Sequence, residues 1–154
     1  MSTSVEAQAL TVGTPAPDFN HVVATGGTPV SLSDYRGQYL VMVFYPKDAT
    51  PGCTRQLCAL RDDLAVLNGM DTQVIAVNPG SLESHERFVA NQGYNFPILV
   101  DADKAISQAY GALKPEGGIQ RTVYVVGPEG SIVYAEQGLP DDSVIMDAIK
   151  QHQG

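Results

Sequence analysis

Hydrophobic positions along the chain follow two alternating patterns, and the clearest example lies between residues 39 and 68. Residues 39–44 form an unbroken apolar run rich in β-branched and aromatic side chains, which predicts a buried strand. Beyond it, leucines recur at spacings of three, four and three, which is typical of one face of a helix: Leu57, Leu60, Leu64 and Leu67. Thr50 suits the N-cap and Pro51 the first helical position, so the sequence predicts a strand, a loop and a helix.

The same alternation continues through the middle of the chain. Residues 73–77 and 96–100 are apolar runs of strand length, and each precedes a helical pattern. Ser81 is placed to cap a helix that continues to about residue 91, and Asp101 to cap one over residues 102–110. The inward positions predicted for the first of these helices are apolar: Leu82, Phe88 and Val89.

The last third of the chain predicts a loop, a hairpin and a helix. Residues 111–118 contain glycines and a proline without periodicity, which indicates a loop. Residues 122–126 and 131–136 flank Gly127-Pro128-Glu129-Gly130, a turn sequence typical of a β-hairpin. Residues 141–152 are predicted to be helical, with three side chains inward: Val144, Ile145 and Ile149.

The beginning of the chain is more irregular. Two short extended segments, 19–24 and 30–32, lie on either side of Gly26-Gly27 and predict an N-terminal β-hairpin, and a capped turn is expected to end at Gly37. Alternating strands and helices that finish in a hairpin and a helix predict an α/β fold with a central mixed sheet flanked by helices. We expect residues 1–11 to be a flexible tail and residues 12–154 a single domain.

Charge narrows the classes of partner. The formal net charge is −8 and the isoelectric point is near 4.6, which argues against nucleic acid or an anionic membrane surface as a ligand. No apolar run reaches the length of a membrane span, and the first ten residues lack the features of a secretory signal. Two closely spaced cysteines then favour a reducing, cytoplasmic compartment, with a removed targeting segment as an open alternative.

Cys53 is the candidate reactive residue. Counted from Thr50, it is the third helical position and therefore lies in the first turn of the predicted helix. Backbone N–H groups without helical partners point out of this end of a helix, and the helix dipole makes it positive. Because such an environment favours the thiolate, which is the nucleophilic form, we predict that Cys53 is a nucleophile.

Cys58 follows Cys53 by five residues in the same predicted helix. On an intact helix, residues five apart have Cα atoms separated by about 8.6 Å and side chains pointing in different directions. A disulfide needs Cα atoms within about 7 Å of each other. A bond between the two cysteines therefore requires the first helical turn to unwind.

The two cysteines could instead have structural or metal-binding roles. Cys58 lies beside the leucine face, where cysteine is often only a small buried hydrophobe. A structural disulfide across so short a loop would strain a helix. A metal site needs about four ligands, and the three histidines are scattered along the sequence. We expect neither a metal nor an organic cofactor.

The sequence around Cys53 resembles a known family. Pro46, Thr50 and Cys53 match the Pro-x-x-x-Thr-x-x-Cys signature of peroxiredoxins, and residues 45–58 are similar to the bacterioferritin comigratory protein (Q-type) branch. The Arg61-Asp62 pair, an early Pro-Ala-Pro-Asp-Phe string and Arg121 match as well, so that the resemblance runs from about Val12 onward. It implies a thioredoxin-like fold, in agreement with the order of predicted elements.

The resemblance also implies roles for individual residues. Cys53 would be the peroxidatic cysteine that attacks a hydroperoxide, and Cys58 the resolving cysteine that joins it in an intramolecular disulfide. Thr50 and Arg121 would donate hydrogen bonds to the reacting oxygens, and Pro46 would shield the thiolate. Thioredoxin, or less often a glutaredoxin, would reduce the disulfide, and the protein would act as a monomer.

Two alternative functions remain at this point. One is a thiol-based redox sensor or disulfide-transfer protein on the same fold, and the other is a binding module with inert cysteines.

The other residues near the signature, and two of the histidines, are expected to have no catalytic role. We expect no catalytic role for Gln56, and we expect Tyr45 to form a wall of the site. His21 and His85 are expected to be surface histidines.

Overall fold

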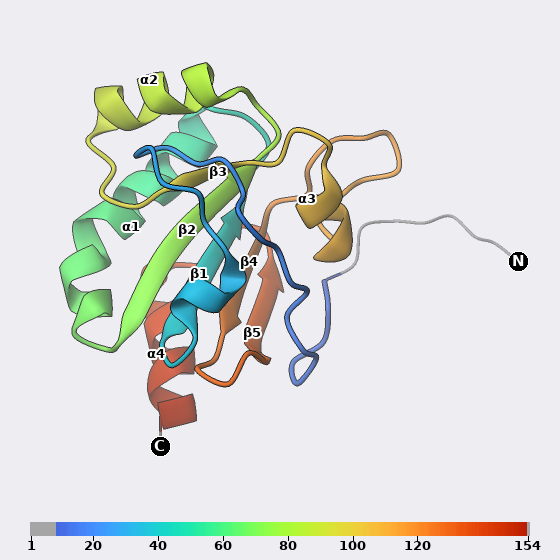
Figure 1. The fold of residues 1–154 in the computed structure, drawn as a ribbon. Coiled ribbons are helices and arrows are strands. Elements are labelled where there is room, and N and C mark those ends of the chain that lie inside the picture. The colour runs from blue at the N-terminus through green and yellow to red at the C-terminus, as the bar shows by residue number, and fades with distance from the viewer. Residues whose placement is uncertain (1–8, 154) are drawn as a thin grey trace, which may run out of the picture.

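Five strands form one mixed sheet in the order β3-β2-β1-β4-β5 (Figure 1). The computed structural model describes residues 9–153, with the side chains of Gly52 and Cys53 left out of the description. The strands are β1 (Tyr39–Phe44), β2 (Thr72–Asn78), β3 (Ile98–Val100), β4 (Thr122–Val126) and β5 (Ile132–Gln137). β1, β2 and β3 are parallel, whereas β4 is antiparallel to both β1 and β5.

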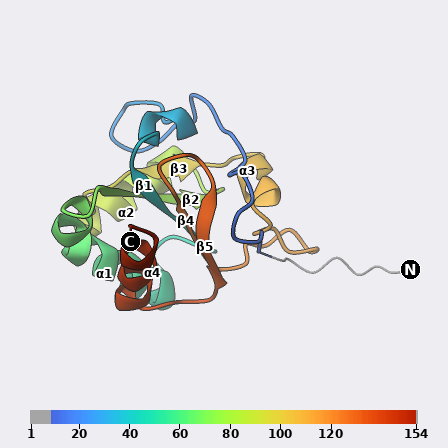
Figure 2. The same ribbon diagram turned by 90° about the horizontal axis from the view of Figure 1, so that it is seen from below.

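Helices cover both faces of this sheet. They are the 3₁₀ turn η1 (Leu32–Tyr35) and the α-helices α1 (Pro51–Asn68), α2 (Leu82–Gln92), α3 (Ala105–Ala109) and α4 (Asp142–Gln153). Helices α1, α2 and α4 pack on one face, and α3 packs on the other together with the N-terminal segment (Figures 1 and 2). The observed architecture confirms the α/β prediction. Among the described residues, no helix is long and apolar enough to cross a bilayer.

Alternation along β1 divides the core into two clusters. Val41 and Val43 face α1, whereas Leu40, Met42 and Phe44 face α3. The four leucines predicted for the inner face of α1 are all buried on the β1 side of the molecule. Burying each of them contributes about 1.5–3 kcal/mol, so the body of α1 from Leu57 onward is anchored on the sheet.

The N-terminal hairpin predicted from the sequence is reduced to a single bridge between Val22 and Val30. The reason is that the segment also pairs with the exposed edge of β3. The N–H of Val100 donates to the carbonyl of Val23 at 2.8 Å, and the N–H of Thr25 donates to that of Ile98 at 3.0 Å. Covering an edge strand in this way protects it from pairing with other chains.

Helix α3 begins three residues later than predicted. Its N-cap residue is Lys104 and not Asp101, although the Asp101 carboxylate accepts from the N–H groups of Ile106 (3.0 Å) and Ser107 (2.7 Å) across an intervening turn. Lys104, in the left-handed region at φ 62°, makes that turn. Strand β3 is likewise shorter than the predicted run, because only residues 98–100 pair with β2.

The prediction that Val144 faces inward is wrong, since its side chain is 43% exposed. Ile145 and Ile149, four residues apart, form the buried stripe of α4. Val144 directly precedes Ile145, so it is rotated by about 100° around the helix and faces solvent.

A pair of carboxyl groups lies where α4 meets α1. Burial raises the pKa of Asp142, and the carboxyl of Asp63 on α1 raises it further, to about 7. An unfolded aspartate has a pKa of about 3.9, so the folded protein binds more protons than the unfolded chain between these values. The free energy of unfolding therefore falls as pH rises from about 4 to 7.

We expect Asp142→Asn to raise the free energy of unfolding at pH 8 by about 1–2 kcal/mol, allowing for solvent screening of half-buried groups. At pH 4.5 the same substitution should have little effect. Urea unfolding at the two pH values measures this difference. Asp147→Asn, an identical change on the exposed side of α4, is the matched control. An equal effect of Asp142→Asn at both pH values would contradict the proposed coupling.

Candidate active site

The candidate residues gather at the edge of the sheet where the parallel strands end. The loop from Tyr45 to Thr50 leaves β1 there and leads into α1, and the turn after Asn78 leaves β2 and leads into α2. β4 begins at the same edge because Thr122 pairs with Phe44. In open α/β sheets, ligands bind outside the carboxyl ends of the parallel strands.

Helix α1 begins as the sequence predicts. Thr50 occupies the N-cap position with extended backbone (φ −79°, ψ 150°), and Pro51 is the first helical residue. The first helical hydrogen bond runs from the N–H of Thr54 to the carbonyl of Thr50 at 2.8 Å. Cys53 is therefore the third helical residue, in the positive first turn, although its side chain lies outside the described part of the structure.

The side chain of Thr50 does not cap the helix, contrary to the expectation for an N-cap threonine. Its hydroxyl donates instead to the carbonyl of Lys47, at 3.0 Å. The bond closes the loop on itself just before α1, so Thr50 shapes the loop. A role as hydrogen-bond donor to a bound peroxide remains a prediction.

Arg121 lies at the same edge of the sheet. It directly precedes Thr122, so the antiparallel register sets it across from Tyr45, at the start of the loop to α1. It is half-buried, and its carbonyl accepts a hydrogen bond from Gly138 at 2.9 Å. The predicted contact between the Arg121 guanidinium and the thiol of Cys53 stays a prediction.

Pro46 ends β1, as expected of a strand terminator. It is the second residue after the last strand residue, Phe44, and it is exposed. Proline lacks the N–H needed to continue the sheet ladder. Its function as a shield for the thiolate stays a prediction.

Cys58 is a free thiol in the second turn of α1, held among polar atoms. Its Sγ donates to Oε1 of Gln92 at 3.5 Å and lies 3.6 Å from the hydroxyl of Tyr94. The Tyr94 hydroxyl also donates to the carbonyl of Thr54, at 3.4 Å. Cys58 is half-buried and hydrogen-bonded, which argues against a purely apolar role.

A cation lies close to this thiol. Arg61 follows Cys58 by three residues, within one helical turn, and forms an ion pair with Asp62 at 2.9 Å. The hydrogen bond with Asp62 and the charge interaction with Cys58 both raise the pKa of Arg61. Arg61 and Cys58 therefore lie close enough on α1 for their charges to interact.

Asp48, for which the sequence predicted no role, lies at the centre of a hydrogen-bond network. Its carboxylate accepts from the Tyr45 hydroxyl at 2.5 Å, from the Ser84 hydroxyl at 2.7 Å and from Nδ1 of His85 at 2.7 Å. Burial alone would raise the pKa of Asp48, but the hydrogen bonds from these three side chains outweigh it and lower the pKa. Asp48 therefore stays ionised inside the protein.

The prediction that His85 is a surface histidine is wrong. Its side chain is fully buried, whereas Leu82 and Val89 on the same helix are only half-buried. The signal was present in the sequence, because His85 is three residues before Phe88 and so lies on the inward face of α2. Tyr45 is buried as expected of a wall residue, but its hydroxyl also belongs to the network.

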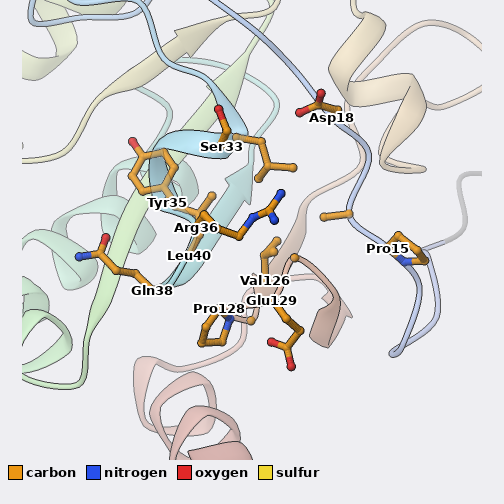
Figure 3. Close-up of a pocket in the computed structure, with 14 residues that line it drawn as sticks. Pro15, Asp18, Ser33, Tyr35, Arg36, Gln38, Leu40, Val126, Pro128 and Glu129 are labelled. Carbon is orange, nitrogen blue, oxygen red and sulfur yellow. The ribbon is translucent and has the colours of Figure 1, made fainter.

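Among the described residues there is no cluster of metal ligands, and a cavity elsewhere on the molecule is lined without a cysteine. Within residues 9–153, leaving aside the side chains of Gly52 and Cys53, no three His, Cys, Asp or Glu side chains could hold a metal ion together. A cavity of about 300 Å³ lies beside Leu40 and Val126, at the opposite end of β1 (Figure 3). Arg36 reaches toward its middle, but no cysteine lines it.

Comparison with known proteins places the chain in a family. The AhpC/TSA family profile matches residues 12–135. The chain is similar to peroxiredoxin Bcp of Bacillus subtilis, with 35% identity over 129 residues that cover 79% of this chain and 82% of the relative. Peroxiredoxin Bcp of Xanthomonas campestris is 34% identical over 129 residues, covering 79% and 81%. The chain belongs to the AhpC/TSA family, the peroxiredoxins.

Solved structures agree with this assignment. Peroxiredoxin Q of Xanthomonas campestris superposes with a TM-score of 0.82 at 30% identity, covering 88% of this chain and 92% of that one. AhpC of Mycobacterium tuberculosis, at 21% identity and a TM-score of 0.85, shares the fold. This peroxiredoxin therefore has the expected thioredoxin-like fold. Its family is one of peroxidases, with a peroxide as substrate and a thiol as reductant.

Proposed function

We propose that this peroxiredoxin reduces hydrogen peroxide and organic hydroperoxides through Cys53, forms an intramolecular disulfide with Cys58, and is recycled by thioredoxin. The observation that carries the proposal is the start of α1. It brings Cys53 into the first helical turn at the carboxyl edge of the sheet, five residues before a second thiol held by polar side chains. The X. campestris neighbour is described as having alkyl peroxide reduction activity, which supports organic substrates here.

In the first step, the Cys53 thiolate attacks one oxygen of the peroxide. The O–O bond breaks, the attacked oxygen remains on sulfur as a sulfenic acid, and the other oxygen leaves as water or an alcohol after taking up a proton. Negative charge spreads over both oxygens in the transition state. The N–H groups of the first turn, the Thr50 hydroxyl and the Arg121 guanidinium are the proposed donors to these oxygens.

In the second step, the Cys58 thiolate attacks the sulfur of Cys53. A disulfide forms, and the sulfenic oxygen leaves as water after protonation. Because the Cα atoms of an intact helix are about 8.6 Å apart at this spacing, the first turn of α1 unwinds before the sulfurs meet. Cys58 also leaves its hydrogen bonds to Gln92 and Tyr94.

The third step needs an external dithiol. Two thiol–disulfide exchanges return both cysteines to thiols and leave the donor as a disulfide. Thioredoxin is the proposed donor and a glutaredoxin the second choice. We propose that the protein acts as a monomer in the cytoplasm, with no nucleic acid, membrane, metal or organic cofactor taking part.

The test is a coupled assay in which thioredoxin, thioredoxin reductase and NADPH supply electrons. NADPH should be consumed in proportion to added hydrogen peroxide or cumene hydroperoxide. A redox sensor or disulfide-transfer protein would instead react slowly with peroxide and accumulate a mixed disulfide with a client protein. A slow, substoichiometric reaction with both peroxides would contradict the peroxidase proposal.

A further inference from the structure

The loop that leads into α1 is attached to the rest of the protein through one carboxylate. Asp48 lies midway between Pro46 and Thr50, and its side chain is only 9% exposed. Two of its three hydrogen-bond donors, Ser84 and His85, belong to the first turn of α2. The segment that orients the first turn of α1 is thus joined to a different helix.

His85 is positioned to carry a positive charge. Nδ1 faces the Asp48 carboxylate at 2.7 Å, and Nε2 faces the backbone carbonyl of Asn78 at 3.1 Å. Both partners are acceptors, so making both bonds requires a proton on each nitrogen, which is the imidazolium form. The side chain has no exposed surface, and a Cβ added at Gly80 would lie 3.1 Å from its Cε1. The ring is therefore tightly enclosed.

A buried charge needs its partner. Removing one member of a buried ion pair leaves the other charge without compensation, which is strongly destabilising. Glu83, a carboxylate on the same helix, is exposed and pairs with Arg87 at 3.4 Å instead. Asp48 is thus the carboxylate that compensates His85 in the described structure, and the two side chains depend on each other.

The loop itself is strained. Ala49, which directly follows Asp48, has φ 66°, a left-handed conformation that is unfavourable for a residue with a Cβ. The bond from Thr50 to the carbonyl of Lys47 closes the same short segment. Strained backbone persists only where surrounding contacts hold it, and the hydrogen bonds to the Asp48 side chain join this segment to α2.

We propose that Asp48 and His85 are positioning residues that hold the first turn of α1 wound, and that this pair separates when the disulfide forms. The inference rests on the proposed function, in which the wound turn reacts with peroxide and the unwound turn accommodates the Cys53–Cys58 bond. The buried ion pair then stabilises the reduced protein alone. It sets how far the thiol–disulfide equilibrium lies toward the reduced side.

The test is the reduction potential of the protein, measured in glutathione redox buffers. His85→Gln should favour the disulfide about tenfold, a shift of about 30 mV to more negative potential for a two-electron couple. Oxidation of Cys53 by peroxide should slow about tenfold, while the later disulfide step stays as fast or becomes faster. General destabilisation would act on both redox states and leave the potential unchanged.

The matched control is His152→Gln, the same substitution at a histidine that bonds Tyr39 at 2.7 Å, at the far end of β1. Its potential should equal that of the unmodified protein. Tyr45→Phe keeps the buried ring and removes the hydroxyl that donates to Asp48, so it should shift the equilibrium in the same direction, about threefold. This variant keeps the test decisive even if His85→Gln folds poorly.

Two results would overturn the inference. One is a potential unchanged in both His85→Gln and Tyr45→Phe, and the other is an equal slowing of both chemical steps. Failure of the proposed function has a different signature, because no disulfide between Cys53 and Cys58 would then form in the unmodified protein either.

Discussion

Cys53→Ser is expected to lower thioredoxin-coupled peroxide turnover by at least about a thousandfold, to the background rate. A serine hydroxyl is not ionised at neutral pH, and the first turn of α1 cannot supply the thiolate that attacks the peroxide. The measurement is NADPH consumption in the coupled assay at several peroxide concentrations. Circular dichroism checks that the variant keeps the helix content of the unmodified protein.

Residual turnover by Cys53→Ser is the result that would contradict this prediction. Turnover by Cys53→Ser above a few per cent of the unmodified rate would exclude Cys53 as the nucleophile. Alkylation gives an independent comparison, because Cys53 should react with iodoacetamide faster than Cys58 at pH 7. An unreactive Cys53 would favour a binding module with inert cysteines.

Cys58→Ser is the second large effect, and it separates the two halves of the cycle. We expect thioredoxin-coupled turnover to fall by about a hundredfold, since the sulfenic acid can no longer become an intramolecular disulfide. One equivalent of peroxide should still be consumed. The product should be a sulfenic acid on Cys53, trapped with dimedone and located by mass spectrometry.

The appropriate control is Ala59→Ser, which adds the same hydroxyl at the next, exposed position of α1. It should turn over like the unmodified protein. Unchanged coupled turnover in Cys58→Ser would assign resolution to the external thiol directly, and the unwinding of α1 would then have no function in the cycle.

Local features of this site could be predicted from the sequence because neighbouring residues determine them. The apolar run of β1, the Thr50-Pro51 start and the leucine stripe predicted the boundaries of α1 correctly. The position of Cys53 in its first turn follows from those boundaries. Periodicity indicated the buried side of α1 because the helix packs on one uniform apolar surface.

Features that depend on contacts between distant segments could not be predicted. His85 is buried because Asp48, 37 positions away, and the end of β2 offer it acceptors on both ring nitrogens. Composition alone favours an exposed histidine in a helix with many charged residues. The N-terminal hairpin was overestimated for the same reason, because its outer segment pairs with β3.

The hydroxyl of Thr50 illustrates a subtler limit. A threonine before a proline at a helix start is expected to cap the helix, and the backbone does adopt the N-cap conformation. The competing acceptor is the carbonyl of Lys47, which the tight loop brings within 3.0 Å. The same loop contains Asp48, whose partners Ser84 and His85 lie 36 and 37 positions away, and the local sequence does not reveal such contacts.

We expect the first turn of α1 to be wound when Cys53 reacts with peroxide and unwound when Cys53 is joined to Cys58. Amide hydrogen exchange, measured by mass spectrometry on the reduced protein and on protein oxidised with one equivalent of peroxide, tests it most directly. We expect residues 51–58 to lose protection on oxidation, while the peptide containing β1 keeps its protection. A mapped Cys53–Cys58 disulfide with unchanged protection of residues 51–58 would contradict the account.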